Sequence, residues 1–76
     1  MPNVQPAGQM PVGEVLDNAV NLIDVARADG NKVLRGLPRT APLFVAVDLV
    51  TALGHLRQAA LLIDGAADTL TDAGVR

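Results

Sequence analysis

The residues that could do chemistry in this sequence are few and widely spaced. His55 is the single histidine, and the absence of cysteine and serine excludes a thiolate metal site, a disulfide and a serine nucleophile. A histidine can act as a general base or bind a metal, but a metal needs further ligands within reach. The nearest candidate, Asp48, precedes His55 by seven residues, about two helical turns. We therefore interpret His55 as a boundary residue at an interface between two copies of the chain.

Three aspartates form the most regular acidic pattern of the chain. Asp64, Asp68 and Asp72 follow one another at intervals of four residues, which places them on one face of a helix. Carboxylates at this spacing can share a hard cation. They also repel one another and lie near a helix C-terminus, where the helix dipole disfavours negative charge. We expect a solvated face there, with no bound metal and no cofactor.

Basic residues gather around the middle of the chain. Most of the six Lys and Arg residues belong to one segment, namely Arg27, Lys32, Arg35 and Arg39. These side chains could contact phosphates or fix the orientation of a partner. The net charge of −2 and the absence of Trp and Tyr argue against nucleic acid as the main partner. No glycine-rich phosphate loop is present either, so we predict that the protein is not an enzyme.

The spacing of apolar residues predicts two long amphipathic helices that position these groups. Both follow a heptad pattern, in which apolar residues alternate by four and three. In the first helix, position a holds Leu16, Ile23, Gly30 and Leu37, and position d holds Val12, Ala19, Ala26 and Val33. In the second helix, position a holds Leu49, Leu56, Ile63 and Leu70, and position d holds Val45, Ala52, Ala59 and Ala66. Position e of the second helix adds Ala46, Leu53, Ala60 and Ala67.

Proline and glycine residues predict the boundaries of these helices. The expected order is a flexible tail over 1–10 and a hairpin over 11–72, made of a helix over 11–36, a bend over 37–40 and a helix over 41–71, followed by a frayed end over 73–76. Pro38 makes the bend a clear break, because proline cannot continue a helix. Thr40 is the expected N-cap of the second helix, with Pro42 in its first turn. Gly30 and Gly65 leave the continuity of each helix open.

Two helices joined by a short bend predict an all-α antiparallel hairpin. A lone hairpin buries one stripe per helix, which rarely offsets the loss of chain entropy. The second helix is also apolar opposite its seam, at a set that we name the Leu43–Val50 patch: Leu43, Phe44, Val47 and Val50. A helix that is apolar on all sides is normally buried on all sides. We therefore expect two hairpins to dimerise into a four-helix bundle with Ala/Leu heptad seams.

The expected dimer has a defined interface and orientation. Its interface residues are the Leu43–Val50 patch together with Leu49, Leu56, Leu16 and Ile23. The bend is positive, whereas the opposite end of the hairpin is negative through Glu14, Asp17, Asp64, Asp68 and Asp72. Opposite charges select orientation even where they add little stability. We therefore predict an antiparallel homodimer.

The function that these patterns favour is protein–protein interaction. We expect a self-associating helical module, a regulatory or accessory factor of a high-GC bacterium or phage, since Arg and Asp far outnumber Lys and Glu. An unidentified protein partner is left open, and a small-molecule substrate is not expected. One alternative is a nucleic-acid-associated regulator that uses the basic bends of a dimer. Another is a membrane-active protein that uses its second helix.

The expected location is the cytoplasm. The N-terminus lacks the basic region and apolar run of a signal peptide. The longest apolar stretch, residues 41–53, is interrupted by Asp48, and a membrane span needs about 20 mostly apolar residues. Nucleic acid and membrane are therefore not the expected partners.

Overall fold

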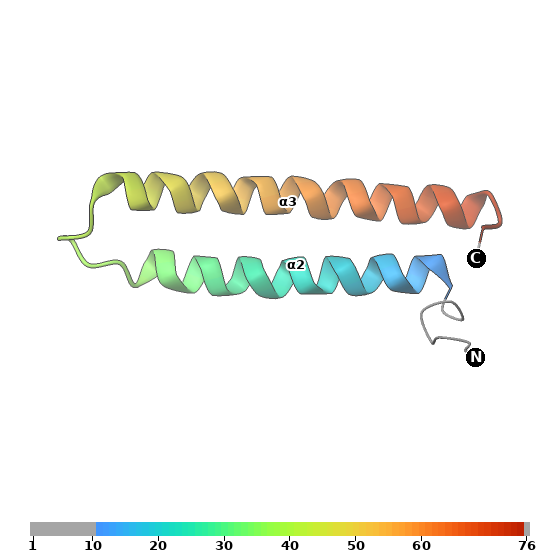
Figure 1. Cartoon of the computed structure of the whole chain (residues 1–76), viewed down its shortest axis with the longest axis horizontal. Coiled ribbons are helices and arrows are strands. Elements are labelled where there is room, and N and C mark those ends of the chain that lie inside the picture. Colours follow the sequence, from blue (N-terminus) through green and yellow to red (C-terminus); the bar gives the residue numbers. More distant parts are fainter. Residues whose placement is uncertain (1–10, 76) are drawn as a thin grey trace, which may run out of the picture.

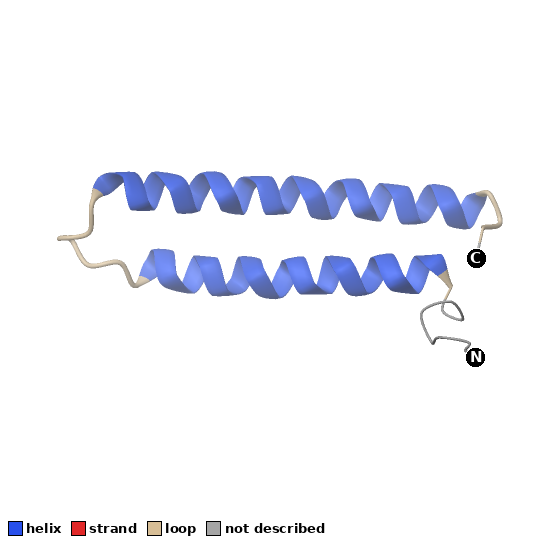
Figure 2. Ribbon diagram, viewed as in Figure 1, coloured by secondary structure: helices blue, strands red, loops and turns tan. Residues whose placement is uncertain are grey.

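The computed structural model describes residues 11–75 and folds them into an antiparallel helical hairpin (Figure 1). Helix α2 spans Val12–Arg35 and helix α3 spans Leu43–Asp72, and residues 11–75 contain no strand (Figure 2). The two helices pack side by side along their length. The start of α2 and the end of α3 lie together at what we call the open end, opposite the bend. The all-α hairpin expected from the heptad pattern is confirmed.

Both helices are continuous through the glycines that left their continuity open. Helix α2 has 24 residues and passes through Gly30, and α3 has 30 residues and passes through Gly65. Gly30 lies against α3, where an added Cβ would come within 2.7 Å of Leu53 Cδ2. A side chain at position 30 would therefore require Leu53 to move, so glycine allows the closest approach of the helices at this level.

The start of α3 corrects one prediction. Thr40 is not its N-cap: the helix begins at Leu43, Pro42 occupies the N-cap position with ψ of 138°, and no side chain caps the helix. The residue before a proline is biased away from the helical region, so Ala41 cannot easily belong to a helix. Likewise, α2 begins after Pro11, which serves as its N-cap rather than as a first-turn residue.

The end of α3 is closed by backbone hydrogen bonds. The Gly74 N–H donates to the Thr71 carbonyl at 3.0 Å, and the Val75 N–H donates to the Leu70 carbonyl at 2.9 Å. Gly74 has φ of +78°, so the two bonds form a glycine-ended helix cap. We expected the chain to fray over 73–76, whereas the donors of residues 73–75 are paired. The tail expected over 1–10 and residue 76 lie outside the described residues.

The contact between the helices is rotated by one residue from the expected seam. Val33 at position d is 54% exposed whereas Leu34 at position e is half-buried. On α3, Ala66 at position d is exposed and Ala67 at position e is only 7% exposed. Positions a and e therefore form most of the contact, and our assignment of d to the seam is wrong at Ala26, Val33, Ala52 and Ala66. The physical reason is the fit between the helices, because Leu53 at position e of α3 packs beside Gly30 of α2.

The hairpin is a single layer of helices. Helix α2 lies beside α3, and no third element in residues 11–75 covers either broad side of the pair (Figure 2). Among the described residues only Ala60 and Ala67 are buried, and no large side chain is fully buried. Folded domains normally cover each apolar face with a second layer. Residues 11–75 leave the two broad faces of this hairpin uncovered.

Candidate interaction surfaces

One broad face of the hairpin is apolar across both helices. We name it the shared face, and its residues are Val15, Leu22, Ala26 and Val33 of α2 with Ala52, Ala59, Leu62 and Ala66 of α3. All are exposed except Ala59, which is half-buried. Residues advance by 100° in an α-helix, so each set forms one stripe beside the a and e positions. A partner could therefore cover apolar side chains of both helices at once, on a surface that also carries the exposed Asp29, Asp48 and His55.

The antiparallel arrangement puts the two stripes on the same side. On each helix, the stripe comes before the contact positions when the residues are followed around the helix in chain order. Because the two helices run in opposite directions, this offset turns both stripes toward the same side of the hairpin. Gly30 lies beside Leu53, and Gly13 lies beside Thr71. These two neighbours fix the level of every residue, and they place Leu22 level with Leu62. The two largest side chains of the shared face, 72% and 64% exposed, thus sit together near the middle of the hairpin.

The Leu43–Val50 patch lies at the bend end of α3, where Figure 1 draws the helix in yellow-green. Leu43 is 80% exposed and Phe44 is 65% exposed, and Val47 and Val50 are also exposed. Helical rotation directs Leu43 and Val50 away from the shared face, whereas Phe44, eighteen residues before Leu62, lies on the same side as Leu62. The patch is therefore shorter than the shared face and only partly separate from it.

The other residues expected in a dimer interface lie between the two helices of one hairpin. Leu16 and Ile23 of α2 and Leu49 and Leu56 of α3 are half-buried at position a, within the hairpin contact. They help to hold the two helices together. The shared face was not recognised from the sequence, because its residues at position d were assigned to that contact.

The basic residues do not all lie together. Lys32, Arg35 and Arg39 are exposed at the bend end. Arg27 lies farther along α2, on the contact side, and its guanidinium lies 3.5 Å from a carboxylate oxygen of Asp24. This is the one ion pair within residues 11–75. A phosphate or an acidic partner at the bend would therefore meet three of the four basic residues.

The acidic residues and His55 are spread along the described part of the chain. His55 and Asp48 are both exposed on α3, as are Asp64, Asp68 and Asp72. No group of three His, Asp or Glu side chains among residues 11–75 comes close enough to hold a metal ion.

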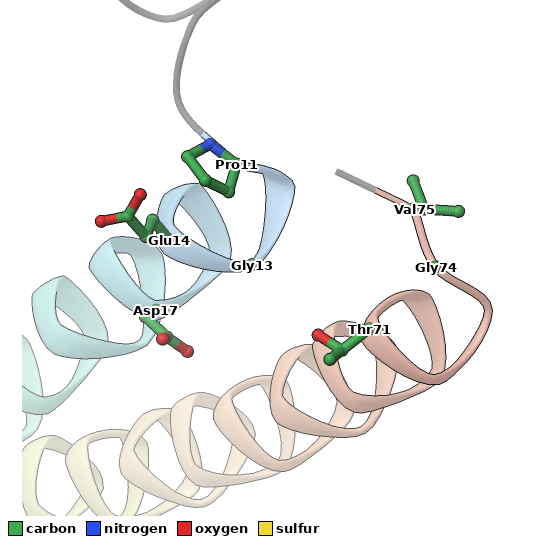
Figure 3. A pocket seen from close by; sticks show the side chains of 7 residues that line it. All are labelled: Pro11, Gly13, Glu14, Asp17, Thr71, Gly74 and Val75. Carbon is green, nitrogen blue, oxygen red and sulfur yellow. The ribbon is translucent and has the colours of Figure 1, made fainter.

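A hollow lies at the open end between the helix termini (Figure 3). Its lining residues are Pro11, Gly13, Glu14, Asp17, Thr71, Gly74 and Val75. The carboxylates of Glu14 and Asp17 come from α2 and point in different directions in Figure 3. All lining residues are exposed except Gly13, so the hollow is a solvent-filled gap at the helix ends.

Helix α3 has the length and hydropathy of a membrane span. It is the one helix in the described region that is long and apolar enough to span a membrane. Only 6% of its most apolar 18-residue stretch is buried within the hairpin. Core helices of soluble proteins can have the same length and composition. The apolar character of α3 agrees with its exposure, because the rest of the described hairpin covers little of its surface.

Comparison with known proteins finds no matching family model, no matching curated protein and no matching solved structure.

Proposed function

We propose that the protein is a non-enzymatic helical interaction module that self-associates. Its working form is an antiparallel homodimer in which two hairpins make a four-helix bundle in the cytoplasm. The observation that carries the proposal is the single layer of helices with an apolar face spanning both of them. A second copy supplies the second layer that a stable helical domain needs.

The exposed area of the hairpin supports self-association. Eleven large apolar side chains of the described residues are exposed, including Leu43 at 80%, Leu22 at 72% and Leu62 at 64%. A standard protein interface buries roughly 800 Å² of each partner. A dimer can therefore form while part of the apolar surface, such as Leu43, remains for another protein.

The distribution of charge supports the antiparallel orientation. Lys32, Arg35 and Arg39 lie at the bend, and Glu14 and Asp17 lie at the open end. A head-to-tail dimer brings each basic bend to the acidic open end of its partner. A bend-to-bend dimer brings like charges together, which disfavours that arrangement.

The direct test is the solution mass of the whole chain by light scattering after size exclusion, over a hundredfold range of concentration. We expect twice the mass of one chain, with helical circular dichroism at every concentration. A folded monomer throughout the range would overturn the proposal. A mass above two chains would replace the four-helix bundle by a larger assembly.

A second candidate function is binding to an anionic membrane through α3. It is favoured by the hydropathy of α3 and by the exposure of Leu43 beside the basic bend. Sedimentation with vesicles of phosphatidylglycerol and with vesicles of phosphatidylcholine tests it. Binding to the anionic vesicles alone, weakened by salt, would support this function. A chain that stays in the supernatant with both would exclude it.

A further inference from the structure

We propose that the second copy of the chain covers the shared face, and that it leaves Leu43, Val47 and Val50 outside the dimer. This inference rests on the proposed self-association and names the surface that carries it. It replaces the interface expected from the sequence, in which the Leu43–Val50 patch met a second chain.

Length favours the shared face over the patch. On α2 the shared face extends from Val15 to Val33, about 27 Å of helix. The Leu43–Val50 patch extends over about 10 Å at one end of α3. Contact between two patches would place the two bends side by side. It would also bring Lys32, Arg35 and Arg39 of both copies together without covering Leu22 or Leu62.

The centre of the shared face suits a twofold axis. Leu22 and Leu62 lie at one level near the middle of the hairpin. A twofold axis next to this pair, at the level shared by Ala26 and Ala59 and perpendicular to the helices, turns one hairpin over onto the shared face of the other. Each bend then lies at the partner's open end, as the charges require. The exposed polar residues Asp29, Asp48 and His55 lie seven or fourteen residues from Leu22 or Leu62, so the second copy meets them together with the apolar side chains.

The sizes of the side chains indicate which helices meet. This symmetry places α3 against α3 of the second copy, and α2 against α2. On α3 the shared face carries Ala52, Ala59 and Ala66 at intervals of seven residues. Small side chains let two helix axes approach closely, whereas Val15, Leu22 and Val33 fill a wider space between the two α2 helices. Ala26 and Ala59 lie closest to the axis, so each has its own copy as a neighbour.

Two adjacent leucines provide a matched test. Leu62 belongs to the shared face, whereas Leu61 points to the other side of α3, and the two are 64% and 57% exposed. We expect Leu62→Asp and Leu22→Asp to raise the dimer dissociation constant by more than about 30-fold, the loss typical of a central interface residue. Leu61→Asp should leave the dimer dissociation constant within a few-fold of that of the unchanged protein. Light scattering gives the masses, and circular dichroism gives the helix content.

A second experiment does not depend on the aspartate variants folding. The chain has no cysteine, so a single one can be introduced without competing thiols. Ala59→Cys and Ala26→Cys should each form a disulfide-linked dimer rapidly under mild oxidation. Val47→Cys and Leu61→Cys should do so at least tenfold more slowly.

The outcomes separate this inference from the proposed function. An unchanged protein that is monomeric throughout would overturn the proposed function itself. A dimer that survives Leu62→Asp and crosslinks fastest through Val47→Cys would overturn the shared face and restore the Leu43–Val50 patch. The inference would be established if only the shared-face variants fail to dimerise and the Ala59→Cys protein forms the disulfide-linked dimer.

Discussion

Single residues decide how each helix of this hairpin begins and ends. Gly74 has φ of +78°, a region that residues with a Cβ rarely adopt, and it allows the two bonds that close α3. At the start of α3, Pro42 took the N-cap position that we expected for Thr40. A glycine or proline near a helix end is visible in the sequence. The residue at which the helix begins depends on how the bend closes, so it was predicted less well.

Replacing glycine by alanine should have opposite effects at two positions. Gly74→Ala should lower the free energy of unfolding by about 1 kcal/mol, because alanine is strained at positive φ. Gly54→Ala should raise it by up to about 1 kcal/mol, since Gly54 lies inside α3 with no atom within 4 Å of an added Cβ. Urea denaturation at one protein concentration measures both. Equal effects of the same sign would contradict the left-handed cap.

At the scale of the helices, rotation by one residue separates the expected contact from the observed one. The heptad pattern predicts that position a faces the other helix, and Leu16 and Leu56 are indeed half-buried. Positions d and e lie on either side of a, so an apolar residue at both leaves the direction of rotation open. The pairing of Leu53 with Gly30 shows how fit between the helices favours position e. Neither helix contains that information alone.

A larger side chain should destabilise the hairpin where the helices contact each other, but not on the solvent-facing side. Ala60 is only 7% exposed, so Ala60→Leu should lower the free energy of unfolding by about 1–3 kcal/mol through overpacking. Ala28 is exposed on α2 and provides the control. Ala28→Leu should change stability by less than about 0.5 kcal/mol. The two variants are compared by urea denaturation at equal concentration, and equal losses would argue against the observed rotation.

At the scale of the whole molecule, the shortage of buried surface is the dominant feature. Only two alanines among residues 11–75 are buried, so the hairpin gains little from its own core. Self-association through the shared face would supply the missing burial. Leu43 and Val50, on another side of α3, would then remain for a further protein or a membrane surface.

Folding coupled to self-association should make thermal stability depend on concentration. We expect the midpoint of thermal unfolding to rise steadily as the protein concentration is raised a hundredfold, because mass action favours the dimer. The measurement is circular dichroism at 222 nm in cells of different path length. Leu62→Asp should abolish most of this dependence. A midpoint independent of concentration in the unchanged protein would indicate a stable monomer.

The sequence by itself determined the two helices, the bend between them and the lack of a large core. These features follow from local spacing, because helical periodicity and proline act within one segment of chain. Only the tertiary structure decided which stripe of each helix meets the other. That choice depends on side-chain fit between distant residues, such as Gly30 with Leu53, and it turned Ala26, Val33, Ala52 and Ala66 outward to form the shared face.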